Sequence, residues 1–275
     1  MGLFTPNYDK PGKGVDKNAP EKRRIWLFFE IIWNQASKLI LANLLYSIAM
    51  LPLMVGVMLC FEINFDNPSI IAFRNNQIDV LGMILLIISL FTSFPATTGF
   101  TYILRNIQRR EHAWIWHDFM KHTRINYFKG VANGFVTLLL YIVLITSYGV
   151  YRSGILNIGF ISYYLAGVML IGVIIFTWMQ FYVNTMIVTF DLKLGTIYKN
   201  AFIFALGKLP LNLMISAICI VLLYTLLLFP IPFLTFLMSF VVWYVLFGFI
   251  VVFSVYPTID QHMISKAKVK SDIEE

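Results

Sequence analysis

The sequence predicts an all-α, polytopic membrane protein with six transmembrane helices and both termini in the cytoplasm. The composition is the first reason, since 59% of the 275 residues are hydrophobic and only 13% are charged, whereas a soluble domain is nearer half apolar and a quarter charged. The second reason is a series of six apolar stretches, each long enough to cross a bilayer. The third is that basic residues gather in alternate connections between those stretches. These observations argue against a soluble enzyme and against a disordered chain.

Two short segments precede the first span. Residues 1–23 are expected to form a flexible, basic arm, because they combine Gly, Pro and Lys with few apolar residues. Residues 24–38 are expected to form a helix that lies in the membrane interface. Trp26, Phe29 and Trp33 recur at spacings of three and four and therefore share one face of that helix.

The six spans are predicted to form a single domain over residues 24–256. A helix needs about 20 mostly apolar residues to cross the hydrocarbon core, and none of the stretches alternates with the period of two that barrel strands require. The predicted spans are 39–61, 80–104, 131–151, 160–190, 211–229 and 233–256. Residues 257–275 follow as a short cytoplasmic tail.

The distribution of basic residues predicts the orientation. Of the 21 Lys and Arg residues, 19 lie in the N-terminal segment, the second and fourth connections and the tail, and only Arg74 and Arg152 lie on the other side. Because Lys and Arg are retained on the cytoplasmic side, we expect a multi-pass membrane protein with both termini inside. The net charge of +7 then indicates contact with the anionic inner leaflet, and not with nucleic acid.

The sequence carries no constellation typical of an enzyme, a cofactor site or a metal site. Cys60 and Cys219 lie inside apolar runs without a neighbouring ligand. His112, His117 and His122 are spaced by five, which does not bring side chains together on a helix. Motifs for a P-loop, a nucleophile elbow or a helical zinc site are missing from the sequence. No ionisable residue falls near the middle of a predicted span, which argues against a proton-coupled pump.

Polar side chains in two of the spans allow two interpretations. In the second span, hydroxyl residues recur every four positions on one face, beside a proline that removes a backbone donor. They form either a groove for a sugar-like solute or a packing seam between helices, and packing is favoured because small residues commonly mediate contacts between membrane helices. The residues are Ser89, Ser93, Pro95, Thr97 and Thr101 in the second span and Gln180 and Asn184 in the fourth.

Two connections are expected to form amphipathic helices at the inner membrane surface, where a partner could dock. The first, residues 105–130, places basic residues beside tryptophans. The second, residues 191–210, ends in Leu-Pro and loosely resembles the coupling loop of import permeases of the ATP-binding-cassette type, although the Glu-Ala-Ala opening is missing. The candidate docking residues are Trp116, Asp118, Phe119 and Lys121 in the first connection and Asn200, Phe202 and Pro210 in the second.

Several longer stretches resemble the YesL family of bacterial membrane proteins. They are FPATTGFTYILRN from Phe94, HAWIWHDFMKHTRINYFKG from His112, KNAFIFALGKLPLNL from Lys199 and VYPTIDQHMI from Val255. The resemblance extends from about Trp26 to Ile264, and the N-terminal arm departs from it. The family's function is unassigned, but its members accompany sugar-uptake genes of Gram-positive bacteria, alongside import permeases and two-component regulators. The resemblance therefore implies a link to carbohydrate transport.

Two main hypotheses about function follow. The first is a non-catalytic membrane accessory or scaffold of oligosaccharide import, which docks on a sugar permease of the ATP-binding-cassette type or on a membrane sensor kinase. The alternative is a stand-alone solute channel or facilitator lined by the second and fourth spans. A membrane enzyme ranks last, because no pair of nucleophile and base can be assembled from the sequence.

Overall fold

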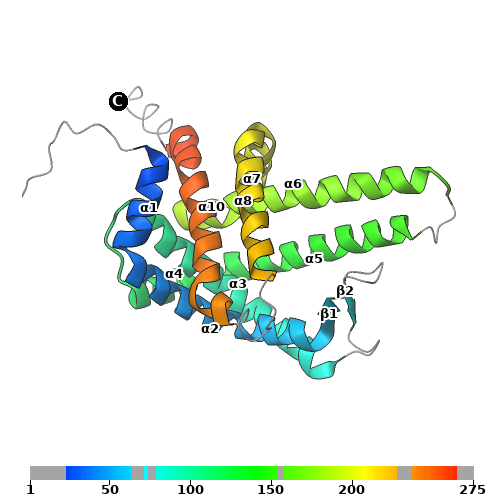
Figure 1. Cartoon of the computed structure of the whole chain (residues 1–275), viewed down its shortest axis with the longest axis horizontal. Coiled ribbons are helices and arrows are strands. Elements are labelled where there is room, and N and C mark those ends of the chain that lie inside the picture. The colour runs from blue at the N-terminus through cyan, green and yellow to red at the C-terminus, as the bar shows by residue number, and fades with distance from the viewer. Residues whose placement is uncertain (1–22, 64–70, 74–78, 154–157, 228–236, 265–275) are drawn as a thin grey trace, which may run out of the picture.

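The structure is a computed structural model of the 275-residue chain, and it describes residues 23–63, 71–73, 79–153, 158–227 and 237–264 (Figure 1). Most of these residues are helical. The α-helices are α1 (Arg24–Asn34), α2 (Ala36–Cys60), α3 (Val80–Gln108), α4 (Ile115–Ile125), α5 (Tyr127–Arg152), α6 (Ile161–Thr189), α7 (Leu194–Gly207), α8 (Leu209–Leu227) and α10 (Tyr244–Ile259). Two π-helical segments flank α10, η2 (Ser239–Trp243) and η3 (Asp260–Ile264). A short hairpin pairs strands β1 (Phe61–Ile63) and β2 (Ile71–Phe73).

Among the described residues, five helical segments are long and apolar enough to cross a membrane. They are α2, α3, α5, α6 and the segment Phe240–Ile264, which contains α10. Helices α7 and α8 meet at a bend of 89° and provide a sixth span if the bent pair crosses as one. The prediction of a helical protein with several membrane-spanning helices is confirmed, with five or six spans where the sequence predicted six.

The bounds of the elements differ from the predicted ones at two places near the N-terminus. Gln35 leaves the helical conformation, with φ −116° and ψ 16°, so α1 ends at Asn34 and α2 begins at once. The first span therefore starts earlier than predicted and the segment before it is shorter. At its other end, Phe61 pairs with Phe73 in the antiparallel hairpin and does not continue α2.

Some predictions fall outside the described residues. They concern the arm before residue 23, Arg74, the end of the span 211–229, the start of the span 233–256 and the tail beyond residue 264.

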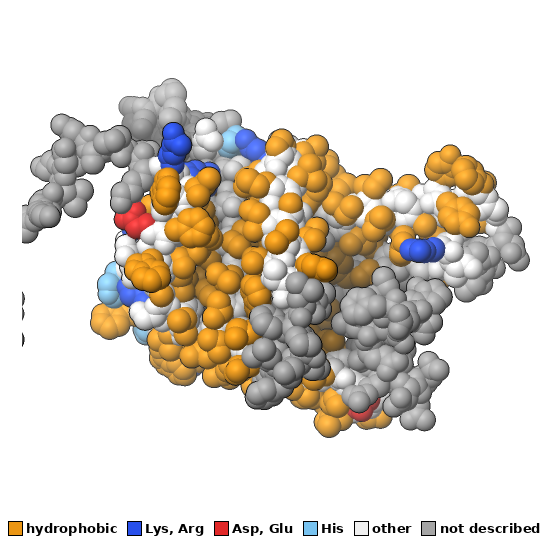
Figure 2. All heavy atoms as spheres, viewed as in Figure 1, with side chains coloured by type: hydrophobic (Ala, Val, Ile, Leu, Met, Phe, Trp, Pro, Cys, Tyr) orange, Lys and Arg blue, Asp and Glu red, His pale blue; other side chains and the backbone are white. Residues whose placement is uncertain are grey.

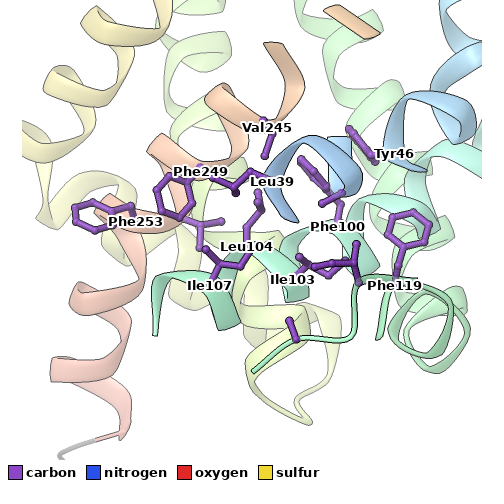
Figure 3. Packing of buried hydrophobic residues seen from close by; sticks show 14 of the residues in the cluster. Leu39, Tyr46, Phe100, Ile103, Leu104, Ile107, Phe119, Val245, Phe249 and Phe253 are labelled. Carbon is purple, nitrogen blue, oxygen red and sulfur yellow. The ribbon is translucent and has the colours of Figure 1, made fainter. Parts of the chain in front are cut away.

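Two hydrophobic clusters form the core, and α10 contributes to both. The first joins α1, α2, α3, α4 and α10, and Figure 3 shows Leu39, Leu104 and Phe249 meeting within it from α2, α3 and α10. The second joins α6, α7, α8 and the later part of α10, around the fully buried Tyr182. In Figure 1 the α5–α6 hairpin extends away from α8 and α10. Hydrophobic side chains cover most of the face seen in Figure 2, as expected of a surface that faces lipid.

A buried asparagine of α2 explains the π-helical segment. The Asn43 amide nitrogen donates to the carbonyl oxygen of Phe240 at 2.6 Å, and its amide oxygen accepts from the backbone N–H of Val245 at 2.7 Å. These two backbone groups are five residues apart, which is the spacing at which a π-turn would pair them. Ser47 also donates to the Phe240 carbonyl, at 3.1 Å. The side chains of α2 thus bond to the two backbone groups that a π-turn would pair with each other.

A second buried asparagine holds the bend between α7 and α8. Asn212 donates to the carbonyl oxygens of Ala205 and Phe204, at 2.9 and 3.3 Å, in the last turn of α7. Its amide oxygen accepts from the hydroxyl of Tyr182 on α6 at 2.8 Å. One side chain therefore satisfies helix-end carbonyls and ties the bend to α6.

Ion pairs and hydrogen bonds join several helix ends into one region. Arg105 near the end of α3 donates to the Val188 carbonyl near the end of α6, at 2.6 Å. Lys129 at the start of α5 pairs with Asp191 just before α7, at 2.8 Å. Arg24 of α1 donates to the Phe253 carbonyl of α10, at 2.9 Å. We call the region defined by these contacts the basic end. Arg110 pairs with Glu30 of α1, Arg109 lies over the Tyr256 ring of α10, and His122 of α4 stacks on Tyr102 of α3. These contacts add α1, α4 and the later part of α10 to the same end of the molecule.

Candidate functional site

A cavity of about 670 Å³ lies between α2, α3, α6, α8 and α10. Its α3 and α6 side carries hydroxyl and amide groups, and its α8 and α10 side is mostly apolar. The polar lining residues of α3 and α6 are Thr97, Thr101, Thr177, Gln180, Asn184 and Thr185. The facing apolar residues include Leu213, Ile220, Phe247, Val251 and Val252. None of the described residues that line the cavity is acidic or basic. The cavity is therefore mostly apolar, with a smaller polar part on α3 and α6, and its described lining residues carry no charge.

The structure separates the hydroxyl residues predicted on the second span into two groups. Thr97 and Thr101 line the cavity, whereas Ser89, Ser93 and Pro95 do not. Ser93 is buried and donates to the carbonyl of Ala49 on α2 at 2.8 Å. Ser89 is also buried, and its hydroxyl donates to the Leu86 carbonyl of its own helix at 2.6 Å.

Pro95 lies against α5 rather than the cavity. A Cβ atom on Gly130 would stand only 2.7 Å from the Pro95 Cα, so the two helices approach closely because Gly130 has no side chain. This close contact and the Ser93 bond match the packing interpretation for that part of the second span.

The hydroxyls of Thr97 and Thr101 are already engaged with α3. Thr97 donates to the Ser93 carbonyl at 3.0 Å and shares a 3.0 Å bond with the hydroxyl of Tyr46. Thr101 donates to the Thr97 carbonyl at 2.7 Å. Hydroxyl oxygens bound in this way keep acceptor capacity toward the cavity. The wall of α3 can therefore accept hydrogen bonds from a ligand more readily than it can donate them.

Gln180 and Asn184 belong to a group of polar side chains that we call the polar cluster: Asn133, Thr137, Gln180, Asn184 and Tyr198. Asn133 on α5 donates to the amide oxygen of Asn184 at 3.3 Å and accepts from the hydroxyl of Tyr198 on α7 at 2.5 Å. The amide nitrogen of Gln180 and the hydroxyl of Thr137 are buried and make no hydrogen bond of normal length in the described part of the chain, although both side chains lie beside the Tyr198 hydroxyl. Unsatisfied polar atoms in an apolar interior are costly, and they point to a missing partner such as water or a ligand.

Sequence reasoning missed three members of the polar cluster. Asn133 stands near the start of an otherwise apolar span, and an amide at such a position is a signal that could have been used. Thr137 and Tyr198 give no comparable signal, because hydroxyl residues are common in membrane helices. Only the packing of α5, α6 and α7 brings the group together.

Arg105 is buried at the basic end and has a structural role. Its side chain bonds Val188, Thr189 and Asn106, and its guanidinium lies 4.6 Å from the centre of the Tyr102 ring. A cation at the C-terminal carbonyls of α6 is favoured by the helix dipole and by the charge-assisted bond.

His122 of α4 lies at the basic end in an environment that lowers its pKa. Its ring stacks on Tyr102 with the ring centres 3.2 Å apart. Burial lowers the pKa of His122 to about 4, because desolvation outweighs the neighbouring carboxylate of Asp118, and Arg105 and Lys121 act in the same direction as burial. In the exposed ion pair nearby, the hydrogen bond from Lys129 lowers the pKa of Asp191. Among the described residues, no group of three or more His, Cys, Asp or Glu side chains could hold a metal ion.

The candidate docking residues of the first connection do not all face outward. Trp116 is 62% exposed and Lys121 is exposed. Asp118 accepts from the backbone N–H of Trp114 at 2.8 Å, near the start of α4, so its carboxylate caps the helix.

Phe119 was predicted to be a docking residue, but it is only 3% exposed and its side chain belongs to the first hydrophobic cluster. The reason is the close approach of α4 to α3, where a Cβ on Gly99 would stand 2.5 Å from the Phe119 carbonyl oxygen. Ile115 and Phe119 consequently form the buried side of α4, and Phe119 cannot contact a partner.

In the second connection, α7 has one buried and one exposed face. Phe202 is 46% exposed, Asn200 is half-buried, and Pro210 is exposed in the first turn of α8, where a proline fits a helix. Ile197, Ala201 and Ala205 form the buried face.

Taken together, these features define a multi-pass helical membrane protein with an uncharged, partly open cavity between its helices and amphipathic helices at its basic end. Residues 25–148 match the model of a protein family described as "Protein of unknown function, DUF624". The matched segment runs from α1 through most of α5, so it includes α4 and the α3 side of the cavity. No curated protein and no solved structure matches the chain.

Proposed function

We propose that this protein is a non-catalytic accessory or scaffold of oligosaccharide import, which docks through α4 and α7 on a sugar permease of the ATP-binding-cassette type or on a membrane sensor kinase. The observation that carries the proposal is the exposure of aromatic side chains, Trp116 and Phe202, on two short helices attached to the basic end. Exposed aromatic residues beside basic ones are typical anchors of protein interfaces.

Three further observations support this proposal. The match to DUF624 agrees with membership of the YesL family, which falls within DUF624 and whose members accompany sugar-uptake genes. The concentration of 19 of the 21 basic residues in alternate connections favours an orientation with the basic end in the cytoplasm, and the resemblance to the YesL family implies that the membrane is a bacterial plasma membrane. Exposed Trp26 and Trp33 on α1 suit a helix that rests in the inner interface, next to anionic lipid.

The test is a pull-down from native membranes followed by mass spectrometry. We expect the tagged protein to recover a sugar permease or a sensor kinase. The double variant Trp116→Ala with Phe202→Ala should reduce that recovery about tenfold or more, because interface aromatics dominate binding energy. Phe160→Ala is the matched control, since Phe160 is 71% exposed at the start of α6, the opposite end of that helix from the basic end. Absence of both partners, or an equal loss with the control, would refute the proposal.

The alternative is a solute facilitator, and the cavity is the observation in its favour. A facilitator needs a continuous polar path, however, and the polar residues nearest the other end of α3, Ser89 and Ser93, are buried with their hydroxyls bonded to carbonyls. We therefore rank it second. Proteoliposomes that release a trapped sugar faster than liposomes without protein would reverse this ranking.

A further inference from the structure

We propose that the cavity binds a single-chain amphiphile with an uncharged, hydroxyl-bearing head group, of which an alkyl glycoside is the simplest example. This inference is independent of docking at α4 and α7, because it rests on the walls of the cavity alone. A cavity of about 670 Å³ falls within the range of about 300–1,000 Å³ that small-molecule sites occupy.

The α8 and α10 wall selects an alkyl chain. Leu213, Ile220, Phe247, Val251 and Val252 present apolar side chains to a space that protein atoms do not fill. Apolar surface of this kind is stabilised by contact with a hydrocarbon chain rather than with water.

The opposite wall selects an uncharged head group. The polar groups of α3 and α6 are hydroxyls and amides, which donate and accept hydrogen bonds as sugar hydroxyls do. A phosphate, sulfate or ammonium head would lose its hydration there without meeting an opposite charge, because the described lining residues include none.

The direction of the ligand follows from the order of residues along α6. The lining changes from Val173 and Ile174 to Gln180 and Asn184 as the helix approaches the basic end. Gln180 lines the cavity, and its buried amide nitrogen, which lies beside the Tyr198 hydroxyl, makes no hydrogen bond of normal length in the described residues. The terminal amide torsion of glutamine is soft, so this donor can turn to meet a head-group oxygen. The head therefore lies beside the polar cluster, and the alkyl chain extends toward Val173.

Photolabelling tests the ligand class on the full-length protein. The chain is extracted from membranes with a styrene–maleic acid copolymer, so that no glycoside detergent is present, and labelled with an octyl glucoside that carries a diazirine in its chain. We expect labelled peptides from α6, α8 and α10, and loss of labelling with excess octyl glucoside. Octyl sulfate and octyltrimethylammonium should not compete. Equal competition by either charged compound, or labelling confined to the lipid-exposed faces around Leu139 and Ile171, would overturn the proposal.

Two variants locate the site. Cys219→Phe places a ring into the cavity, and Val221→Phe places the same ring at a position of α8 that is 61% exposed and does not line the cavity. We expect the first to abolish labelling and the second to leave it unchanged. Gln180→Leu should weaken binding about tenfold through the lost hydrogen bond. If Cys219→Phe fails to fold, the competition series on the unaltered protein still tests whether the cavity prefers an uncharged head group. Unchanged labelling in a folded Cys219→Phe variant would refute the assignment of the site to the cavity.

Discussion

Asn43 is the single residue whose loss we expect to destabilise the protein most. Asn43→Leu removes the hydrogen bonds to the Phe240 carbonyl and the Val245 N–H. Ser47 still donates to the carbonyl, but the buried N–H of Val245 loses the acceptor that Asn43 provides. We expect the free energy of unfolding to fall by about 2–4 kcal/mol, measured by thermal and chemical unfolding of the purified protein. Ser47→Ala is the control, because the Phe240 carbonyl then keeps its bond from Asn43, and the loss should be about 1 kcal/mol. Equal effects of the two variants would contradict this account of the π-helical segment.

His122 makes stability depend on pH in a predictable direction. Burial holds the pKa of His122 at about 4 in the folded protein, against 6.5 for the free side chain. Between these values the unfolded chain takes up a proton that the folded chain does not, so stability is complete above about pH 6.5 and declines as the pH falls toward 4.

The variant His122→Phe isolates this contribution. Phenylalanine keeps an aromatic ring against Tyr102 but cannot titrate, so the midpoint of thermal unfolding should vary less between pH 6.5 and pH 4 than it does in the unaltered protein. A pH profile that is unchanged by the substitution would show that other groups carry the acid sensitivity.

At the scale of elements, the sequence predicts helices well and their joints poorly. The start of α3 at Val80 coincides with the predicted one, where Asp79 caps the helix by accepting from the Gly82 N–H at 2.8 Å. The break at Gln35 carries no glycine or proline to mark it. The bend before Pro210 does carry such a mark, but its angle depends on Asn212 reaching back to α7. The tendency to form a helix depends on residues close together in the sequence, whereas the geometry of a joint depends on contacts with residues farther away.

The joint between α7 and α8 yields a prediction at this scale. Asn212→Leu removes the bonds to the last carbonyls of α7 and leaves the Tyr182 hydroxyl without its acceptor. We expect faster amide hydrogen exchange confined to α7 and the first turns of α8, with little change in α5. Tyr182→Phe removes only one of these bonds and should raise exchange there far less. Exchange that rises evenly through the chain would show that Asn212 stabilises the whole protein and not the joint.

At the scale of the whole molecule, the cavity could be predicted only in part. Thr97, Thr101, Gln180 and Asn184 are visible in the sequence as polar residues on apolar helices, and they do line it. Ser93 follows the same spacing but faces α2, because the hydroxyl pattern continues along α3 while the neighbouring helix changes. The apolar wall could not be predicted from the sequence, because an apolar residue that lines a cavity cannot be distinguished by its type from one that faces lipid. Only the crossing of α6 with α8 and α10 distinguishes them.

The orientation of the whole molecule in the membrane can be tested at the two ends of α5. Lys121 on α4 is exposed next to the basic end, and Ser153 is exposed at the far end of α5. Since α5 has 26 residues, it separates the two by about 39 Å, more than the hydrocarbon core of a bilayer. In a background of Cys60→Ala with Cys219→Ala, we expect a membrane-impermeant maleimide to label Ser153→Cys on intact cells. Lys121→Cys should react only after the membrane is opened, because the basic residues hold that end in the cytoplasm. The reverse labelling pattern would show that the protein has the opposite orientation in the membrane. In that orientation α4 and α7 could not reach the cytoplasmic part of a permease or kinase.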